Sequence, residues 1–384
     1  MGNRGMGNVL INGPRGTKDI LPDTVAQWLY LEERIRDICR CYGYREIRTP
    51  IFEHTELFLR AIGETTDVVE KEMYTFPDRG GRSLTLRPEN TASAVRSYLQ
   101  NKLYAAESIV KLFYMGSMFR YDRPQAGRYR EFHQFGVEAL GEINPSVDVE
   151  IILLAIEFLR SLGLEALVLH LNSVGCPKCR PAYREKLQAF FRPEMAELCT
   201  DCQSRFARNP LRILDCKNEH CHALSQGAPR ITDCLCDECK AHFDKVQSYL
   251  KELDVPFELD SNLVRGLDYY TKTAFEVQYT PLGAQSAVAG GGRYDGLVEE
   301  IGGDATPGIG FAIGLERVLL ALEKQELLPE IEEYVDVFFV ALGEAAEKTS
   351  FKLMQKVRAA GLAAAMDFAG RSLKAQMKQA NKKK

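Results

Sequence analysis

Apolar side chains recur at two spacings along the chain, and the two kinds of run alternate irregularly. Helical spacing is clear over residues 23–41, where Gly43 follows the last turn, and it returns over residues 147–162 and 315–323. A further helix is expected to open at Pro88, because a proline is tolerated in the first turn of a helix. Strand-like runs are predicted at residues 45–50, 84–86, 109–119, 131–140, 166–171, 275–279, 286–289 and 308–313.

This order lacks the regular strand–helix alternation of a parallel sheet. It favours an α+β fold, in which helices pack on an antiparallel sheet. Beyond Pro329 the pattern changes to strand, helix, strand and a basic helix, which predicts a small α/β unit. We therefore expect a disordered leader at residues 1–13, a main domain at 14–172 and 243–325, a cysteine-rich helical insertion at 173–242, and the α/β unit at 334–384.

The composition is that of a globular protein, with 45% hydrophobic and 27% charged residues. No apolar run approaches the roughly 18 residues of a membrane span, and the Gly- and Asn-rich start lacks the apolar core of a signal peptide. We therefore expect a cytoplasmic protein with no membrane partner. The net charge of −4 argues weakly against a nucleic-acid partner, so any RNA contact has to come from local basic patches.

Eleven cysteines are many for a cytosolic chain, and nine of them lie between Cys176 and Cys239. Because disulfides do not persist in a reducing cytosol, this clustering indicates metal binding. Cysteines separated by two residues have the spacing of zinc ligands. One structural zinc site is predicted from Cys176, Cys179, Cys199 and Cys202. A second would use Cys216, Cys221, Cys236 and Cys239, with Cys234, His220 and His222 as spare ligands. A set of reduced, unpaired thiols is the alternative.

A polar loop separates the strands predicted at residues 109–119 and 131–140, the pattern of an antiparallel hairpin with a long tip. The loop carries Arg120, Arg123, Arg128 and Arg130. On the returning strand Gln134, Gly136 and Glu138 share one face, because side chains alternate along a strand. Arginine forks suit phosphate oxygens, whereas a solvated tip is an equally good interpretation of this segment alone.

Three further segments combine glycine with polar side chains. Residues 263–270 (LVRGLDYY) present a cation and hydroxyls either to the edge of the core or to a polar ligand. Residues 289–297 (AGGGRYDGL) contain three glycines, which allow a close backbone approach or form a simple turn. Residues 308–319 (GIGFAIGLERVL) place Arg317 in the first turn of a helix, where a cation opposes the helix dipole. This position indicates an anionic partner unless Arg317 pairs with Glu316 or another acid.

A fourth segment, residues 84–96 (LTLRPENTASAVR), has Glu89 and Thr91 at a strand-to-helix junction, where they could simply cap the helix. The arginine hairpin, the Arg317 helix and residues 48–58 (RTPIFEHTELF) together resemble the three motifs of class II aminoacyl-tRNA synthetases. LVRGLDYY and GGGRYDGL resemble the two motifs peculiar to histidyl-tRNA synthetases, and RGTKDILP near the N-terminus resembles that family's signature. The resemblance implies a class II catalytic domain with an antiparallel sheet flanked by helices, and a partial C-terminal anticodon-binding domain.

The family's reaction is that of a histidine–tRNA ligase. Histidine is activated with ATP to histidyl-adenylate and pyrophosphate, and is then transferred to the 3′ end of its tRNA. The resemblance implies that Arg120 binds the α-phosphate of ATP and that Arg317 binds the γ-phosphate end, with magnesium on the outer phosphates. It makes Arg265 a third catalytic residue, a cation for the α-phosphate and the histidine carboxylate.

The resemblance also implies a histidine site. Glu138 and Tyr270 are the implied partners of the imidazole, with Tyr294 nearby. The α-amino group is expected to bind Glu89, Thr91 and Gln134. Asn90 stands where the family often has glycine, for which we expect only a small local adjustment.

For tRNA, the resemblance implies that Arg123 and Gln125 lie near the acceptor end and that the insert embraces the acceptor arm. The C-terminal unit is shorter than an anticodon-binding domain, so we expect it to be truncated, and anticodon recognition stays open. Its basic face is expected to bind RNA or to be merely solvated, and consists of Arg371, Lys374, Lys378 and Lys382. A homodimer is implied, with the stretch around Pro50 at the interface.

Two other functions are compatible with parts of this pattern. One is a catalytically inactive, synthetase-like regulatory subunit of ATP phosphoribosyltransferase, which the short C-terminus favours. The residues that oppose it are Arg265, Tyr270, Tyr294 and Arg317, which such paralogues tend to lose. The other is a class II synthetase for threonine or proline, against which LVRGLDYY argues.

Overall fold

The computed structural model describes residues 10–63, 66–216, 218–264, 266–329 and 335–382. The chain divides into two compact units, Met1–Leu328 and Pro329–Lys384. Most of the expected leader lies outside the described residues, and residues 10–13 are exposed without regular secondary structure. None of the described helices combines the length and the apolar character that crossing a membrane requires.

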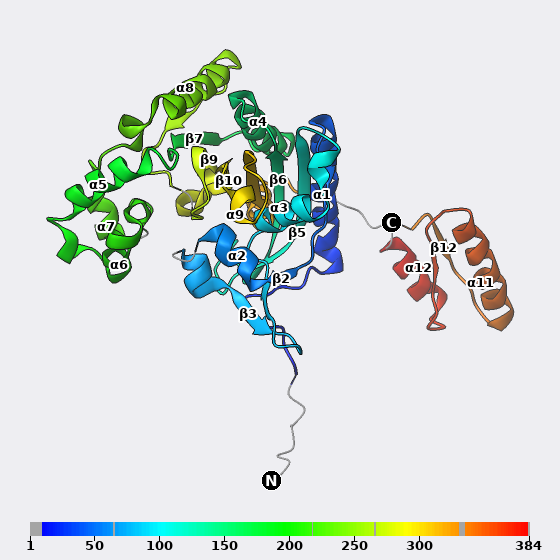
Figure 1. The fold of residues 1–384 in the computed structure, drawn as a ribbon. Helices are drawn as coiled ribbons and strands as arrows, with labels where there is room; N and C mark the ends of the chain where they lie inside the picture. Colours follow the sequence, from blue (N-terminus) through cyan, green and yellow to red (C-terminus); the bar gives the residue numbers. More distant parts are fainter. Residues whose placement is uncertain (1–9, 64–65, 217, 265, 330–334, 383–384) are drawn as a thin grey trace, which may run out of the picture. The chain divides into compact units, whose positions relative to one another are not determined.

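An eight-stranded sheet forms the centre of the first unit (Figure 1). The strands lie in the order β1-β5-β6-β11-β10-β9-β7-β8. Neighbours are antiparallel except at the two edges, where β1 and β5, and β7 and β8, are parallel. The bounds are β1 Arg45–Glu46, β5 Val110–Phe119, β6 Glu131–Leu140, β7 Leu167–Ser173, β8 Glu258–Leu259, β9 Thr271–Tyr279, β10 Ala287–Arg293 and β11 Gly308–Gly314. The predicted α+β fold with a mainly antiparallel sheet is confirmed.

Successive side chains along a strand point to opposite faces of the sheet, and each face packs into a hydrophobic core of its own. On one face Phe113 and Val137 pack with four helices, which are α1 (Pro22–Cys41), α4 (Pro145–Ser161), α8 (Asp237–Glu252) and α10 (Leu315–Lys324). On the other face Leu112 and Ala274 pack with α2 (Thr55–Ile62), α3 (Thr91–Gln100) and α9 (Leu297–Glu300). This second core also contains Tyr270 and Tyr294, so it is the face that bears the candidate site. A small sheet of β2 (Phe52–His54), β4 (Ser83–Leu86) and β3 (Tyr74–Pro77) precedes α3.

Four elements predicted in the main domain start or end three or more residues from the expected limit. Strand β9 begins at Thr271 and not at residue 275, and β10 runs to Arg293 and not to residue 289. The helix expected to open at Pro88 begins at Thr91, because both carboxylate oxygens of Glu89 accept backbone N–H groups, from Thr91 at 2.7 Å and from Ala92 at 3.0 Å. The strand expected over residues 45–50 is β1 alone, because the chain then turns toward Arg87. There the carbonyl of Thr49 accepts from the Arg87 guanidinium at 3.1 Å.

The cysteine-rich insert leaves the sheet after β7 and returns through α8, and Figure 1 draws it in green. Its shorter helices are α5 (Arg180–Phe191), α6 (Thr200–Arg208) and α7 (Glu219–Leu224). They enclose a core of their own, formed by Tyr183, Leu187, Phe191, Leu198, Cys202, Ile213, Leu214, Cys221 and Ile231. The return helix α8 is anchored to the main body, because His242 Nε2 lies 3.0 Å from Asp148 Oδ1 on α4.

The second unit is a small α/β body. Strands β12 (Val337–Phe339) and β13 (Ala364–Met366) are parallel, and helices α11 (Glu344–Ala359) and α12 (Leu373–Asn381) accompany them. Gln376 on α12 ties this unit together, because its amide nitrogen donates to the carbonyl of Ala341 at 2.7 Å. Arg371 does not join the expected basic helix face, since it precedes α12 and pairs with Asp367 at 2.7 Å.

Candidate active site

A buried carboxylate on β6 organises the first part of the site. Glu138 is 1% exposed, and its Oε1 accepts hydrogen bonds from the hydroxyls of Thr91 at 2.7 Å and Tyr114 at 3.1 Å. Its Oε2 accepts from the hydroxyl of Tyr294. Burial raises the pKa of Glu138 to about 8, although the bonds from Tyr294 and Thr91 act in the opposite direction. A ligand that donates hydrogen bonds or carries positive charge would favour the ionised form of this acid.

Glycines on the neighbouring strands make room for this network. Gly310 lies opposite Glu138 across β11 and β6, and a Cβ there would collide with the carboxylate. Gly136 lies opposite Tyr114 across β6 and β5, and a Cβ there would collide with the phenol ring. The glycines Gly290, Gly291 and Gly292 are part of β10 and are not a turn, so they bring backbone up to the site.

A pocket of about 180 Å³ adjoins the network. It is lined by five of the six residues expected to bind histidine, which are Glu89, Thr91, Gln134, Tyr270 and Tyr294. The sixth, Glu138, contacts two of them through its hydrogen bonds. Glu89 therefore has both of its suggested roles, since it caps α3 and also lines the pocket, and burial raises its pKa.

One polar atom in this pocket lacks a partner. Gln134 Oε1 is buried and accepts no hydrogen bond within the described residues. Buried carbonyl oxygens are nearly always hydrogen-bonded in folded proteins, so this one indicates that a ligand supplies the donor. An ammonium group or an N–H group has the required chemistry.

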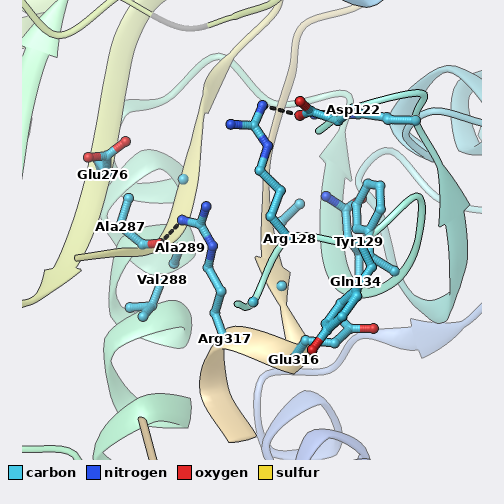
Figure 2. Close-up of a pocket in the computed structure, with 16 residues that line it drawn as sticks. Asp122, Arg128, Tyr129, Gln134, Glu276, Ala287, Val288, Ala289, Glu316 and Arg317 are labelled. Atoms are coloured by element: carbon cyan, nitrogen blue, oxygen red, sulfur yellow. Dashed lines mark hydrogen bonds and ion pairs between the residues drawn. The ribbon is translucent and has the colours of Figure 1, made fainter. Parts of the chain in front are cut away.

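A larger pocket of about 320 Å³ lies next to the first, with Arg120, Gln134, Gly290 and Ala312 lining both. Figure 2 shows Arg317 and Arg128 in it, reaching from α10 and from the hairpin tip. Arg317 Nη1 donates to the carbonyl of Ala287 at 2.6 Å. The acid beside it, Glu316, instead accepts the backbone N–H of His133 at 2.8 Å. The simple Glu316 pairing considered for Arg317 is therefore not what the structure has.

The electrostatics of the larger pocket favour an anion. Burial and the neighbouring Arg128 lower the pKa of Arg317, because two cations face one region of low polarity. Arg128 is itself paired with Asp122. Arg120 stands where the pockets meet: its Nε donates to the carbonyl of Pro88 at 2.8 Å, and its guanidinium lies 5.4 Å from the centre of the Phe132 ring.

The hairpin arginines thus have different roles. Arg123 and Gln125 are exposed near the tip, away from the pocket linings. Arg130 is structural, because its guanidinium lies 3.9 Å from the centre of the Tyr121 ring and its backbone N–H donates to the carbonyl of Gly16 at 2.7 Å. Arg265 lies outside the described residues, although Gly266 and Tyr270 on its C-terminal side line the smaller pocket.

Sequence reasoning missed several residues of the site, three of which carry a hydroxyl or carboxyl group. Tyr114 and Tyr269 line the smaller pocket, and Glu276 lines the larger one. The position of Tyr114 follows only from the strand register, which pairs it with Gly136. Tyr269 precedes the predicted Tyr270, and both side chains enter the core because the segment is not a regular strand.

The cysteines come together in two groups of four, but not in the expected sets. One group is Cys176, Cys179, Cys236 and Cys239, and the other is Cys199, Cys202, Cys216 and Cys221. Within each group the sulfurs lie within 4.8 Å of one another. The grouping of successive pairs was therefore wrong, because α8 carries the last pair back to the first. Cys234, His220 and His222 belong to neither group.

A mainly antiparallel sheet that bears an arginine hairpin, an arginine at the start of a helix and a small polar pocket is the arrangement that the class II aminoacyl-tRNA synthetase motifs of the sequence predicted. The sequence profile described as Histidyl-tRNA synthetase matches residues 16–318. Histidine–tRNA ligases from Desulforamulus reducens and Moorella thermoacetica are 58% and 59% identical to this chain over 374 residues. These matches cover 97% of this chain and 89% and 88% of the respective relatives.

Among solved structures, the apo histidyl-tRNA synthetase of S. aureus matches with a TM-score of 0.81 and 45% identity, covering 97% of this chain and 89% of that one. The chain belongs to the histidyl-tRNA synthetase family, as the sequence motifs predicted. A structure titled ATP phosphoribosyltransferase regulatory subunit/histidyl-tRNA synthetase, from Bacillus halodurans, matches with a TM-score of 0.68 at 22% identity and covers 97% of each chain. That likeness is one of fold alone, and the regulatory-subunit alternative is the less supported.

Proposed function

We propose that this chain is a histidine–tRNA ligase. The carboxylate of histidine attacks the α-phosphorus of ATP, the bond to the bridging oxygen breaks, and pyrophosphate leaves. The terminal ribose hydroxyl of the tRNA then attacks the carbonyl carbon of histidyl-adenylate, and AMP leaves. The observation that carries this proposal is the junction of the two pockets at Arg120, which places a small polar pocket beside one lined by arginines.

In the smaller pocket, Glu138 and Tyr270 bind the imidazole, with Tyr294 orienting the Glu138 carboxylate. The support is that Glu138 is buried and already tied to Thr91 and Tyr294. Such a site rejects side chains that cannot replace its hydrogen bonds. Gln134 accepts from the α-ammonium group through its unpartnered Oε1, and Glu89 and Thr91 complete that end.

In the larger pocket, Arg120 binds the α-phosphate and Arg317 binds the γ-phosphate end. Arg265 adds a cation that bridges the α-phosphate and the histidine carboxylate. Catalysis of this kind rests on positioning and charge stabilisation. Magnesium neutralises the outer phosphates when ATP is bound, and Glu276 is a carboxylate in the pocket with the oxygen chemistry that this ion prefers.

Transfer RNA approaches from the side of the exposed hairpin tip, with Arg123 and Gln125 as contacts to its acceptor end. The α/β unit supplies a basic face from Lys374, Lys378 and Lys382 for the anticodon arm. A homodimer forms around Pro50, where Ile51 and Phe52 are each 48% exposed. Zinc serves as a structural ion in the insert, because sets of four thiolates leave no open coordination position for catalysis.

The test is amino-acid-dependent ATP–pyrophosphate exchange on the purified chain, with Arg265→Ala beside it. We expect exchange with histidine alone and a loss of about 10²-fold or more in the variant, the usual effect of removing a group that stabilises transition-state charge. Arg123→Ala is the matched control, because the exposed tip should leave exchange intact and reduce only transfer to tRNA. Histidine binding without exchange in the unmodified chain would instead favour the regulatory subunit.

A further inference from the structure

The two cysteine groups are nested within one another along the chain. The outer group joins the first and last pairs of the insert, Cys176 and Cys179 with Cys236 and Cys239. The inner group joins the four cysteines between them, which are Cys199, Cys202, Cys216 and Cys221. Each group therefore closes a different loop, the outer one at the base of the insert and the inner one within it.

The sulfur geometry fits a tetrahedral zinc ion. Four sulfurs at about 2.3 Å from zinc are about 3.8 Å apart. In the outer group Cys176 Sγ lies 3.7 Å from Cys179 Sγ and 3.9 Å from Cys236 Sγ. In the inner group the sulfurs of Cys199 and Cys216 are 3.8 Å apart. These separations are too long for a disulfide at about 2.05 Å. They also leave no room for the sulfide ions of an iron–sulfur cluster.

Backbone amides provide a second, independent sign of thiolate binding. The N–H of Cys236 donates to Cys179 Sγ at 3.1 Å, and the N–H of Cys199 donates to Cys221 Sγ at 3.2 Å. Such hydrogen bonds orient metal ligands and spread their negative charge. Each group has such a bond, and in each case the donor is the N-cap residue of a helix, Cys236 for α8 and Cys199 for α6.

The inner group holds the helix that touches the active site. Cys199 and Cys202 stand at the start of α6, and the same helix carries Arg205 and Arg208. Arg205 Nη2 lies 2.6 Å from Asp67 Oδ2, and Arg208 Nη1 lies 2.7 Å from Glu70 Oε1. Lys71 Nζ lies 3.2 Å from Asp201 Oδ1, so three ion pairs join α6 to residues 67–71.

Residues 66–72 contact both the smaller pocket and the arginine hairpin. Val68 lines the smaller pocket. The carbonyl of Glu72 accepts the backbone N–H of Tyr121, at the root of the arginine hairpin, at 2.7 Å. A cavity of about 490 Å³ between α6 and this segment is lined by Arg120 as well as by Cys199 and Cys216. The inner thiol group, α6 and the substrate pockets thus form one continuous set of contacts.

We propose that the insert binds two zinc ions in these nested sites, and that the inner zinc holds α6 against residues 66–72 and so positions the histidine pocket. The outer zinc fastens the base of the insert, where the chain leaves β7 and enters α8. The part about the histidine pocket rests on the proposed function, whereas the two metal sites do not.

Metal content measured by mass spectrometry on the purified full chain tests the sites and their grouping. The unmodified chain should hold two zinc ions. Cys179→Ser with Cys239→Ser should lose one, and Cys202→Ser with Cys221→Ser should lose the other. Cys179→Ser with Cys202→Ser should lose both. Grouping by successive pairs predicts the opposite result. Both zinc ions would then be lost in Cys179→Ser with Cys239→Ser, and only one in Cys179→Ser with Cys202→Ser. That result overturns the nested grouping, and iron or fewer than one metal ion in the unmodified chain overturns the zinc assignment.

Hydrogen–deuterium exchange over residues 66–72 tests the coupling without any activity measurement. Faster deuterium exchange is expected in the double variant Cys202→Ser, Cys221→Ser, which lacks the inner zinc ion. It is also expected in Asp67→Asn, although that variant should keep both zinc ions. Asp244→Asn is the control, because Asp244 is exposed on α8.

In pyrophosphate exchange, Asp67→Asn should raise the KM for histidine about three- to tenfold with little change in kcat. Unchanged deuterium exchange in both variants overturns the coupling. Absent pyrophosphate exchange in the unmodified chain overturns the proposed function and leaves the metal counts standing.

Discussion

The two pockets of the candidate site are adjacent but are stabilised in opposite ways. Beside the smaller one a buried carboxylate is surrounded by hydrogen-bond donors of the protein itself, since Glu138 accepts from Thr91, Tyr114 and Tyr294. In the larger one two of the three arginines are held by carbonyl oxygens, Arg317 by that of Ala287 and Arg120 by that of Pro88, whereas Arg128 pairs with Asp122. A carbonyl fixes an arginine without neutralising it. The first pocket is therefore prepared for selection by hydrogen bonding, and the second for binding negative charge.

The largest effect on activity is expected from removing Arg120, the arginine that lines both pockets. Arg120→Ala should lower kcat for histidine-dependent pyrophosphate exchange by about 10³-fold, because the charge of the transition state is no longer matched. Arg123→Ala, on the exposed tip of the same hairpin, should retain near-normal exchange. Equal losses in the two variants would show that the hairpin, and not the Arg120 position, is what matters.

A smaller effect is expected from neutralising the acid of the selective pocket. Glu138→Gln keeps the shape of the side chain but turns one acceptor oxygen into a donor, which leaves the hydroxyl of Thr91 or Tyr294 mispaired. We expect kcat/KM for histidine to fall about 10²-fold, the cost of a lost charged hydrogen bond together with an unsatisfied group. The KM for ATP should change little. A matching rise in both KM values would contradict the division of labour between the pockets.

The smallest effect concerns the pH dependence of stability. Because the pKa of Glu138 is raised from 4.5 to about 8, the folded chain retains a proton that the unfolded chain releases. Its contribution to stability is full below the unfolded pKa and is lost as pH rises through the folded one. As the pH rises from about 5 to about 8, the melting temperature of the unmodified chain should therefore fall relative to that of Glu138→Gln. Parallel melting curves across this range would show that the carboxyl is ionised throughout.

Three of the strands that carry the site, β5, β6 and β11, could be predicted closely, because their long apolar runs leave little freedom. The expected hairpin over 109–119 and 131–140 corresponds to β5 and β6, with Val110 opposite Leu140. The predictions that were wrong concern features that local sequence patterns do not determine. The start of α3 was misplaced because a glutamate side chain, and not the proline, sets the first turn.

The cysteine grouping failed for a related reason. Spacing along the chain tells which two cysteines form a pair, but the return path of α8 decides which pairs meet. Tyr114 was missed because its place in the site depends on its register against Gly136, which no local pattern reveals. Features that depend on neighbouring residues in the sequence could thus be predicted, whereas contacts between distant residues could be identified only from the fold.

Glycines on β10 and β11 form part of the lining of the smaller pocket. Gly310 and Gly290 line it, and a Cβ at Gly310 would displace the carboxylate of Glu138. An enzyme engineer who wishes to admit a bulkier analogue of histidine thus gains no space at these two glycines. Among the described residues of the two strands, only Phe311 and Ala312 also line the pocket with side chains. Space could also come from side chains on other segments, such as Val68 at the start of a π-helical turn or Tyr269 in a loop. The substrate range of such a site can be narrowed by many substitutions but widened by few.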